Sequence, residues 1–107
     1  MYIYEKIAEA CKELTIGGVY DVSEIKQLIL AKTDVKEGNI LPKDYCYNVT
    51  NKGADENKFI IWPRLFEYVK RGTYIYLGEG YPYNGQVVYA KDKDIYGHWT
   101  DGKFERF

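Results

Sequence analysis

No apolar run in the 107-residue sequence approaches the ~18 residues that a membrane-spanning helix needs. The opening stretch MYIYEKIAEACKEL also lacks the pattern of a secretion signal, because charged residues interrupt its apolar ones. The two cysteines, Cys11 and Cys46, have no C-x-x-C partner. We therefore expect a cytoplasmic protein whose cysteines are buried free thiols, since disulfide and zinc frameworks need other spacings.

The sequence is also poor in the residues of catalytic sites. His98 is the only histidine, and no Ser, Cys or acidic residue stands at a spacing that suggests a proton relay with it. The GEG motif at residues 78–80 is followed by Tyr81-Pro82, which cannot open the phosphate-binding helix that such a motif requires. The carboxylates are scattered and form no metal-binding pattern. We expect a non-enzymatic protein without catalytic residues, metal or cofactor.

What the sequence has in excess is aromatic residues. Twelve tyrosines and an aromatic share of 17% accompany an ordinary hydrophobic fraction of 46% and a net charge of −1. A chain of this length can remove roughly two thirds of its unfolded surface from water, which is enough for a core without metal or disulfides. Tyrosine is therefore expected both in the core and on the surface.

The first elements are predicted to be helical. Apolar residues recur every three to four positions from Ile3 to Leu14, with charged residues on the other side, which predicts an amphipathic helix. The pair Gly17-Gly18 ends it. Residues 19–21 leave room for only a very short extended segment.

Two further helices are expected before residue 50. Asp21 with Glu24 three residues later has the capping-box pattern, and the apolar stripe that follows predicts a helix to about Lys32. A third, shorter helix is predicted at residues 39–49, with Pro42 in its first turn and a strong turn signal after it at residues 51–53.

The second half of the chain reads as β-structure. Residues 65–69 and 73–77 alternate as antiparallel strands joined by Lys70-Arg71-Gly72, in which glycine supplies a positive φ. A brief strand is expected at residues 86–90. A last hairpin at residues 95–107 is predicted around Asp101-Gly102, a strong two-residue turn signal.

Helices followed by a hairpin with a basic tip give the element order of the winged helix-turn-helix fold. The segments YDVSEI, GNILPKDYCYNVTNKG and RLFEYVKRGTYIYLGEGYPYNG resemble an uncharacterised winged-helix-like family of small bacterial and phage proteins, whose modules also stand beside nuclease domains. This resemblance covers residues 2–89. It implies an α+β, winged helix-turn-helix-like domain at residues 1–89, and we expect a C-terminal β-hairpin extension at residues 90–107 packed on it. For a phage-encoded member, the location would be the host cytoplasm.

The resemblance implies a nucleic-acid-binding module, with double-stranded DNA as the leading partner. In such folds the third helix enters the major groove and the hairpin contacts phosphates, where cations release condensed counterions. Residues 36–74 hold seven Lys or Arg against five Asp or Glu, a surplus of two positive charges. Amide side chains near the end of the third helix, those of Asn48 and Asn51, have the groups to read an adenine edge. The predicted contacts are Lys43, Asn48, Asn51, Lys52, Arg64, Lys70 and Arg71.

Other interpretations stay open. Lys70 and Arg71 also fit a solvated hairpin tip that protects a sheet edge, and Asn48 and Asn51 also fit helix C-capping and turn formation. A second function is a phage or mobile-element protein that inhibits a host nuclease or defence protein through an aromatic surface. That surface would comprise Tyr47, Tyr81, Tyr83 and Trp99. A homodimer through the C-terminal hairpin is a third possibility.

Overall fold

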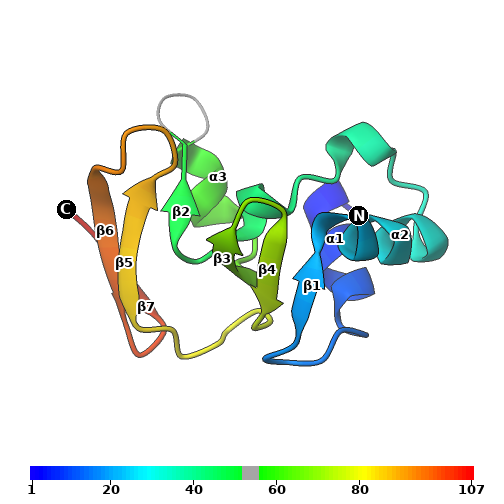
Figure 1. Cartoon of the computed structure of the whole chain (residues 1–107), viewed down its shortest axis with the longest axis horizontal. Coiled ribbons are helices and arrows are strands. Elements are labelled where there is room, and N and C mark those ends of the chain that lie inside the picture. Colours follow the sequence, from blue (N-terminus) through cyan, green and yellow to red (C-terminus); the bar gives the residue numbers. More distant parts are fainter. Residues whose placement is uncertain (52–55) are drawn as a thin grey trace.

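Two β-sheets with helices packed against them make up the computed structural model, which describes residues 1–51 and 56–107 (Figure 1). One sheet has the strand order β1-β4-β3 and the other the order β2-β5-β6-β7. In chain order the elements are α1 (Ile3–Cys11), β1 (Val19–Asp21), α2 (Val22–Lys32), the 3-10 turns η1 (Glu37–Asn39) and η2 (Pro42–Tyr45), β2 (Val49–Thr50), α3 (Glu56–Ile61), β3 (Phe66–Lys70), β4 (Thr73–Tyr76), β5 (Gly85–Tyr89), β6 (Ile95–Thr100) and β7 (Lys103–Arg106).

The first two predicted helices and the short strand between them are confirmed. The capping box forms as its spacing requires: Asp21 Oδ1 accepts a hydrogen bond from the Glu24 amide at 2.8 Å, and Glu24 Oε1 accepts one from the Asp21 amide at 3.0 Å. Helix α1 begins similarly, because Glu5 Oε1 accepts a hydrogen bond from the Tyr2 amide at 2.9 Å. Both helices pack on the β1-β4-β3 sheet.

The predicted third helix at residues 39–49 is wrong. Leu41, which precedes Pro42, is not helical (φ −122°, ψ 88°), because proline disfavours the α region for the residue before it, and only the single turn η2 follows. Tyr45, Cys46 and Tyr47 are then buried in succession, at 1%, 0% and 2% exposure. Consecutive buried residues suit a strand that is covered on both faces, whereas an amphipathic helix exposes part of each turn. The expected turn at residues 51–53 lies largely outside the described residues.

The winged helix-turn-helix fold is therefore also wrong. Among the described residues there are seven strands in two sheets. The α-helix that follows α2 in these residues is α3, which has six residues and packs on the second sheet. The segment 46–50 occupies the place expected for the recognition helix. It runs parallel to β3, through the bridge of Cys46 with Phe66, and parallel to β5, through the pairs Val49 with Val88 and Thr50 with Tyr89.

Both predicted hairpins are confirmed. Strands β3 and β4 pair in antiparallel fashion around the turn that contains Gly72, whose φ is +79°. Strands β6 and β7 are joined by Asp101 (φ 49°) and Gly102 (φ 81°), and two positive φ values define a type I′ turn. Strand β6 also pairs with β5, so that residues 95–106 belong to the second sheet.

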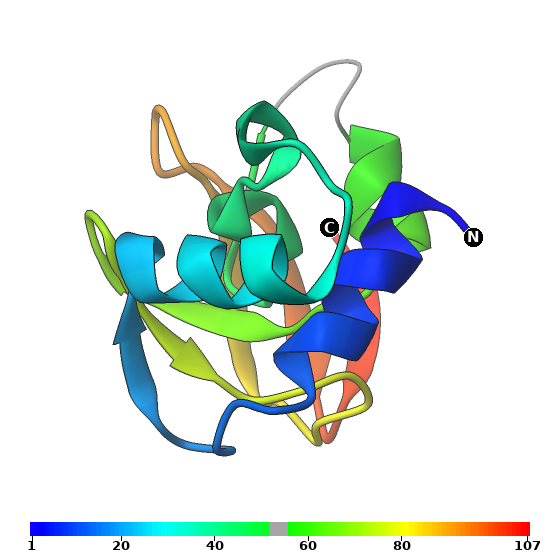
Figure 2. The same cartoon turned by 90° about the vertical axis from the view of Figure 1, so that its right-hand side faces the viewer.

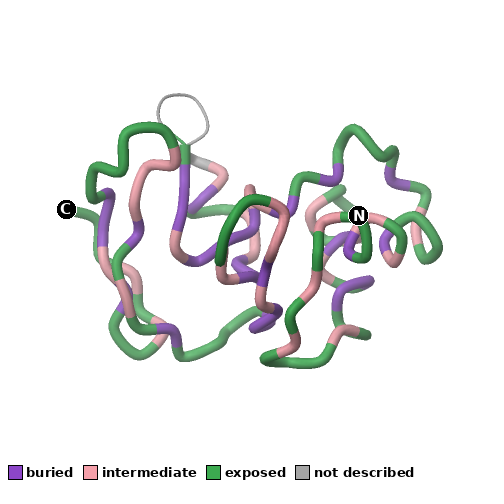
Figure 3. Tube along the Cα trace, in the orientation of Figure 1, coloured by how far each residue is buried: buried purple, intermediate pink, exposed green. Residues whose placement is uncertain are grey.

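The buried apolar side chains of residues 1–51 and 56–107 form two hydrophobic clusters. The first lies between α1, α2 and the β1-β4-β3 sheet, and the second is an aromatic cluster between α3 and the second sheet. Figure 3 shows the buried positions running through the centre of the molecule, with the turns between strands mostly exposed. Segment 46–50 contributes to both clusters, since Cys46 belongs to the first and Tyr47 to the second.

The two thiols are free and buried, as predicted from their spacing. Burial raises the pKa of Cys11 to about 12 and also raises that of Cys46. Because the thiolate is the reactive form, we expect neither cysteine to react with a thiol reagent at pH 8 until the protein unfolds. Mass spectrometry after timed alkylation, with and without denaturant, measures this. Rapid modification of the folded chain would contradict the burial.

Candidate functional site

The predicted DNA-contacting residues fall into two groups, those held by the fold and those free at its surface. Asn48 belongs to the first group. Its Nδ2 donates to the Tyr68 carbonyl at 2.9 Å, and its Oδ1 accepts from the Tyr68 amide at 2.8 Å. The side chain thereby pairs with the edge of β3 as a neighbouring strand would, using its carbonyl oxygen and one of its two N–H donors.

Arg64 also serves the fold. Its side chain is buried, with the residue 7% exposed, and its guanidinium stacks 4.7 Å from the Phe59 ring centroid. Burial lowers its pKa to about 10, so that it stays protonated at neutral pH. It donates to four main-chain carbonyls, those of Cys46 (3.0 Å), Asp44 (2.8 Å), Lys58 (3.2 Å) and Trp62 (3.3 Å). Arg64 therefore fastens η2, α3 and segment 46–50 together and is not available to a phosphate.

Lys70, Arg71 and Asn51 lie at the surface. Lys70 ends β3, Arg71 is in the β3–β4 turn, and Asn51 follows β2. Lys43 is close to this region, because its ammonium lies 4.7 Å from the ring centroid of Tyr68 in β3. Lys52 is outside the described residues. The structure thus brings three of the predicted cations to one region.

The parallel pairing of segment 46–50 adds two cations from the C-terminal third. Because this segment is parallel to both β3 and β5, the carboxyl ends of β3, β2 and β5 lie on the same side of the molecule. The turn that follows β5 contains Lys91 and Lys93, and Figure 2 shows it projecting on the same side as the β3–β4 turn, at the left of that view. We call the set Lys43, Lys70, Arg71, Lys91 and Lys93 the strand-end surface.

Sequence reasoning missed Lys91 and Lys93. The signal was the KDKD run between two predicted strands, but these residues had been assigned to a separate extension. Two acidic residues share the turn, and Asp92 Oδ1 accepts a hydrogen bond from the Asp94 amide at 3.2 Å. The five cations of the strand-end surface stand among four carboxylates: Asp92 and Asp94 in this turn, Asp44 next to Lys43, and Asp21, which pairs with Thr73 at the β3–β4 turn. Its positive surplus is therefore small.

The aromatic residues predicted to bind a protein are mostly interior. Tyr47, Tyr83 and Trp99 are at most 9% exposed, whereas Tyr81 is at the surface with 36%. The Trp99 Nε1 donates to the Tyr47 carbonyl at 2.8 Å, and the Tyr47 hydroxyl donates to the carbonyl of Gly78 at 2.6 Å. The Tyr83 hydroxyl donates to Glu67 Oε2 at 2.6 Å. Three of the four rings therefore build the second cluster.

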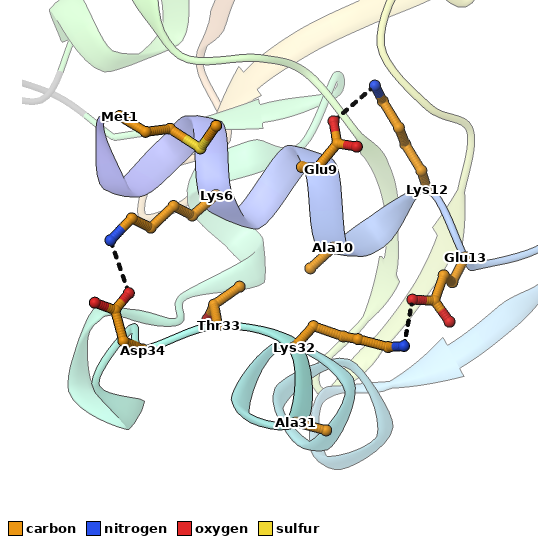
Figure 4. Close-up of a pocket in the computed structure, with 10 residues that line it drawn as sticks. All are labelled: Met1, Lys6, Glu9, Ala10, Lys12, Glu13, Ala31, Lys32, Thr33 and Asp34. Atoms are coloured by element: carbon orange, nitrogen blue, oxygen red, sulfur yellow. Dashed lines mark hydrogen bonds and ion pairs between the residues drawn. The ribbon is translucent and has the colours of Figure 1, made fainter.

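A groove of about 800 Å³ separates α1 from the end of α2 (Figure 4). Its charged side chains are matched in ion pairs: Lys6 with Asp34 at 2.7 Å, Lys32 with Glu13 at 2.9 Å, and Lys12 with Glu9 at 2.8 Å. The first two pairs cross the groove. They connect residues in and just after α1 with the last residue of α2 and the segment that follows it. The groove thus offers no surplus of either charge to a ligand.

Within residues 1–51 and 56–107, no group of three or more His, Cys, Asp and Glu could hold a metal ion. In the same residues, no helix has the length and apolar character needed to cross a bilayer.

Comparison with known proteins identifies the family. Residues 2–106 match the model of the family described as "Domain of unknown function (DUF7225)", and the chain belongs to that family. The match includes the C-terminal hairpin, which the winged-helix resemblance did not. The chain is 37% identical over 107 residues to the "Uncharacterized protein YnaC" of Bacillus subtilis (strain 168), covering 95% of this chain and 38% of the length of that relative. No solved structure matches it.

Proposed function

We propose that this member of the family is a non-enzymatic recognition module that binds the sugar-phosphate backbone of nucleic acid, with duplex DNA as the leading target. The observation that carries the proposal is the parallel placement of segment 46–50 between β3 and β5, which gathers five cations from three parts of the sequence at one end of the sheets. A cytoplasmic location, where nucleic acid is accessible, is part of the proposal.

The chemistry of this surface favours phosphate contacts over base reading. Lysine and arginine side chains on exposed turns can follow a flexible anionic backbone, and each phosphate that they neutralise releases counterions. The amide of Asn48 is occupied by β3, and no helix among the described residues takes the place of a recognition helix. Binding should therefore depend strongly on salt and weakly on sequence.

The nuclease-inhibitor alternative has less support. Its predicted surface needed four exposed aromatic side chains, and three of them are buried. Tyr81 alone of that set is at the surface, which is too small an apolar area for an inhibitory interface.

A titration of fluorescent duplex DNA at several salt concentrations tests the proposal. If all five cations contact phosphates, the slope of log Kobs against log[salt] should be about −4.5, because each contact contributes about −0.9. The double variant Lys91→Ala/Lys93→Ala should flatten the slope by about 1.8, and Arg71→Ala by about 0.9. Anisotropy measures the affinity.

The matched control is Lys12→Ala/Lys103→Ala. It also removes two cations, but Lys12 follows α1 and Lys103 lies at the β6–β7 turn, at the opposite end of the sheets. Its slope should equal that of the wild type. Absence of binding at about 50 mM salt, or equal slopes for the two double variants, would overturn the proposal.

A further inference from the structure

A second surface, beside the start of α1 and the end of α3, is apolar. Five large side chains beside the start of α1 are between 44% and 82% exposed: Met1, Tyr2, Ile3, Leu41 and Ile61. They line two adjoining grooves that share Tyr2. One contains Ile3, Leu41 and Trp62, and the other contains Met1, Ile61 and Pro63. We call these five residues the α1–α3 apolar face.

The face is held on a rigid base. The Tyr2 ring stacks on Tyr4 (5.3 Å between centroids, 10° between planes), Tyr4 stacks on Trp62 (5.9 Å), and Trp62 stacks on Tyr45 (5.3 Å). Tyr45 belongs to the first hydrophobic cluster and is 1% exposed. The exposed Tyr2 thus ends a column of four rings that reaches the core. Side chains ordered in advance lose little conformational entropy when a partner binds.

Most charges around the face are paired within the chain. Lys58 lies 3.9 Å from Asp44, Lys6 pairs with Asp34, and Lys12 pairs with Glu9. Glu5, which accepts the hydrogen bond of the Tyr2 amide, and Glu79, which lines the second groove, leave a small surplus of negative charge. Such a face does not attract nucleic acid, and salt screens the repulsion between its exposed carboxylates when two copies meet.

The size of the face fits a small dimer interface. Five side chains of about 200 Å² each, at the exposures given above, present on the order of 600 Å² of apolar surface. That is as large as the largest apolar patch of a typical monomer, and it approaches the roughly 600–800 Å² that each partner contributes to a specific interface.

We propose that the protein forms a two-fold symmetric homodimer in which the α1–α3 apolar faces of two copies pack against each other. In such an isologous contact both copies use the same patch, so that each α1–α3 apolar face is covered by the identical face of the other copy. This inference goes beyond the proposed function and is independent of nucleic acid. It also differs from the dimer predicted through the C-terminal hairpin, which lies elsewhere in the molecule (Figure 1).

Sedimentation velocity of the full chain without nucleic acid tests the inference. From about 1 μM to about 500 μM the wild type should pass from monomer to dimer, as a small apolar interface of micromolar affinity requires. Leu41→Glu and Ile61→Glu should each raise the dissociation constant at least tenfold, because each buries a carboxylate in the contact. Far-UV circular dichroism should be unchanged, since both side chains are more than half exposed.

Two control variants locate the contact. Val69→Glu places the same charge at an apolar residue of β3 that is 50% exposed. It stands next to the β3–β4 turn, which in Figure 2 lies at the left, away from the N-terminus, and it should leave the dimer intact. Phe107→Ser removes the exposed aromatic end of the C-terminal hairpin and should also have no effect. A wild type that is monomeric at every concentration would overturn the inference. So would a dimer that dissociates in Phe107→Ser but not in Leu41→Glu and Ile61→Glu.

Discussion

Arg64→Ala is expected to lower the free energy of unfolding by roughly 3–5 kcal/mol, the cost of breaking a buried charged network. The substitution leaves the carbonyls of Cys46, Asp44, Lys58 and Trp62 without their guanidinium donor, and at least the buried ones have no access to water. Domains of this size are stable by only about 5–15 kcal/mol, so the variant should be partly unfolded at 37 °C. Urea denaturation followed by tryptophan fluorescence measures the loss.

Arg64→Lys separates the shape of the donor from its charge. An ammonium cannot replace a planar fork that serves carbonyls in several directions, so we expect this variant to lose roughly 2 kcal/mol. Arg71→Ala is the control, because Arg71 is exposed in a turn and its loss should change stability by less than about 0.5 kcal/mol. If Arg64→Ala were as stable as Arg71→Ala, the structural role of Arg64 would be refuted.

Trp99→Ala is expected to cost about 3–5 kcal/mol as well, through the loss of a large buried aromatic side chain. The centroid of the Trp99 ring lies 5.2 Å from that of Tyr47, 6.0 Å from that of Phe59 and 5.3 Å from that of Phe104. The Trp99 Nε1 also donates a hydrogen bond to the Tyr47 carbonyl. The cavity would lie in the centre of the second cluster. Thermal unfolding by circular dichroism should show a markedly lower midpoint.

The comparison for Trp99→Ala is Tyr81→Ala. Both residues had been predicted to bind a protein partner, but Tyr81 is 36% exposed and Trp99 is 9% exposed. Tyr81→Ala should therefore cost less than about 1 kcal/mol. A Trp99→Ala variant with wild-type stability would return Trp99 to the list of candidate binding residues and contradict its place in the core.

Local signals predicted the local elements of this fold. The capping box of Asp21 and Glu24, the Asp101-Gly102 turn and the Gly72 turn each act over two to four residues, and each formed as expected. Residues 39–49 were assigned wrongly because their apolar positions fit the inward face of a short helix as well as a buried strand. The extended conformation is selected by pairing with β3 and β5, which lie 20 and about 40 residues further along the chain.

The candidate site was also predictable only where local sequence signals define it. The basic turn at Lys70 and Arg71 was visible in the sequence, because a hairpin tip is exposed wherever the hairpin lies. The contribution of Lys91 and Lys93 depends on β5 lying parallel to segment 46–50, which no local pattern indicates. Likewise, an arginine in a loop gives no sign that three carbonyls from other segments will surround it, as happens to Arg64.

Segment 46–50 also has a consequence for how the chain acquires its structure. It cannot complete its main-chain pairing until Phe66 and then Val88 and Tyr89 have been synthesised. During synthesis, segment 46–50 would therefore stay unpaired after the residues of α1 and α2 have been made. The contacts that fix this segment close over long loops, which favours slow, late and all-or-none acquisition of the native state.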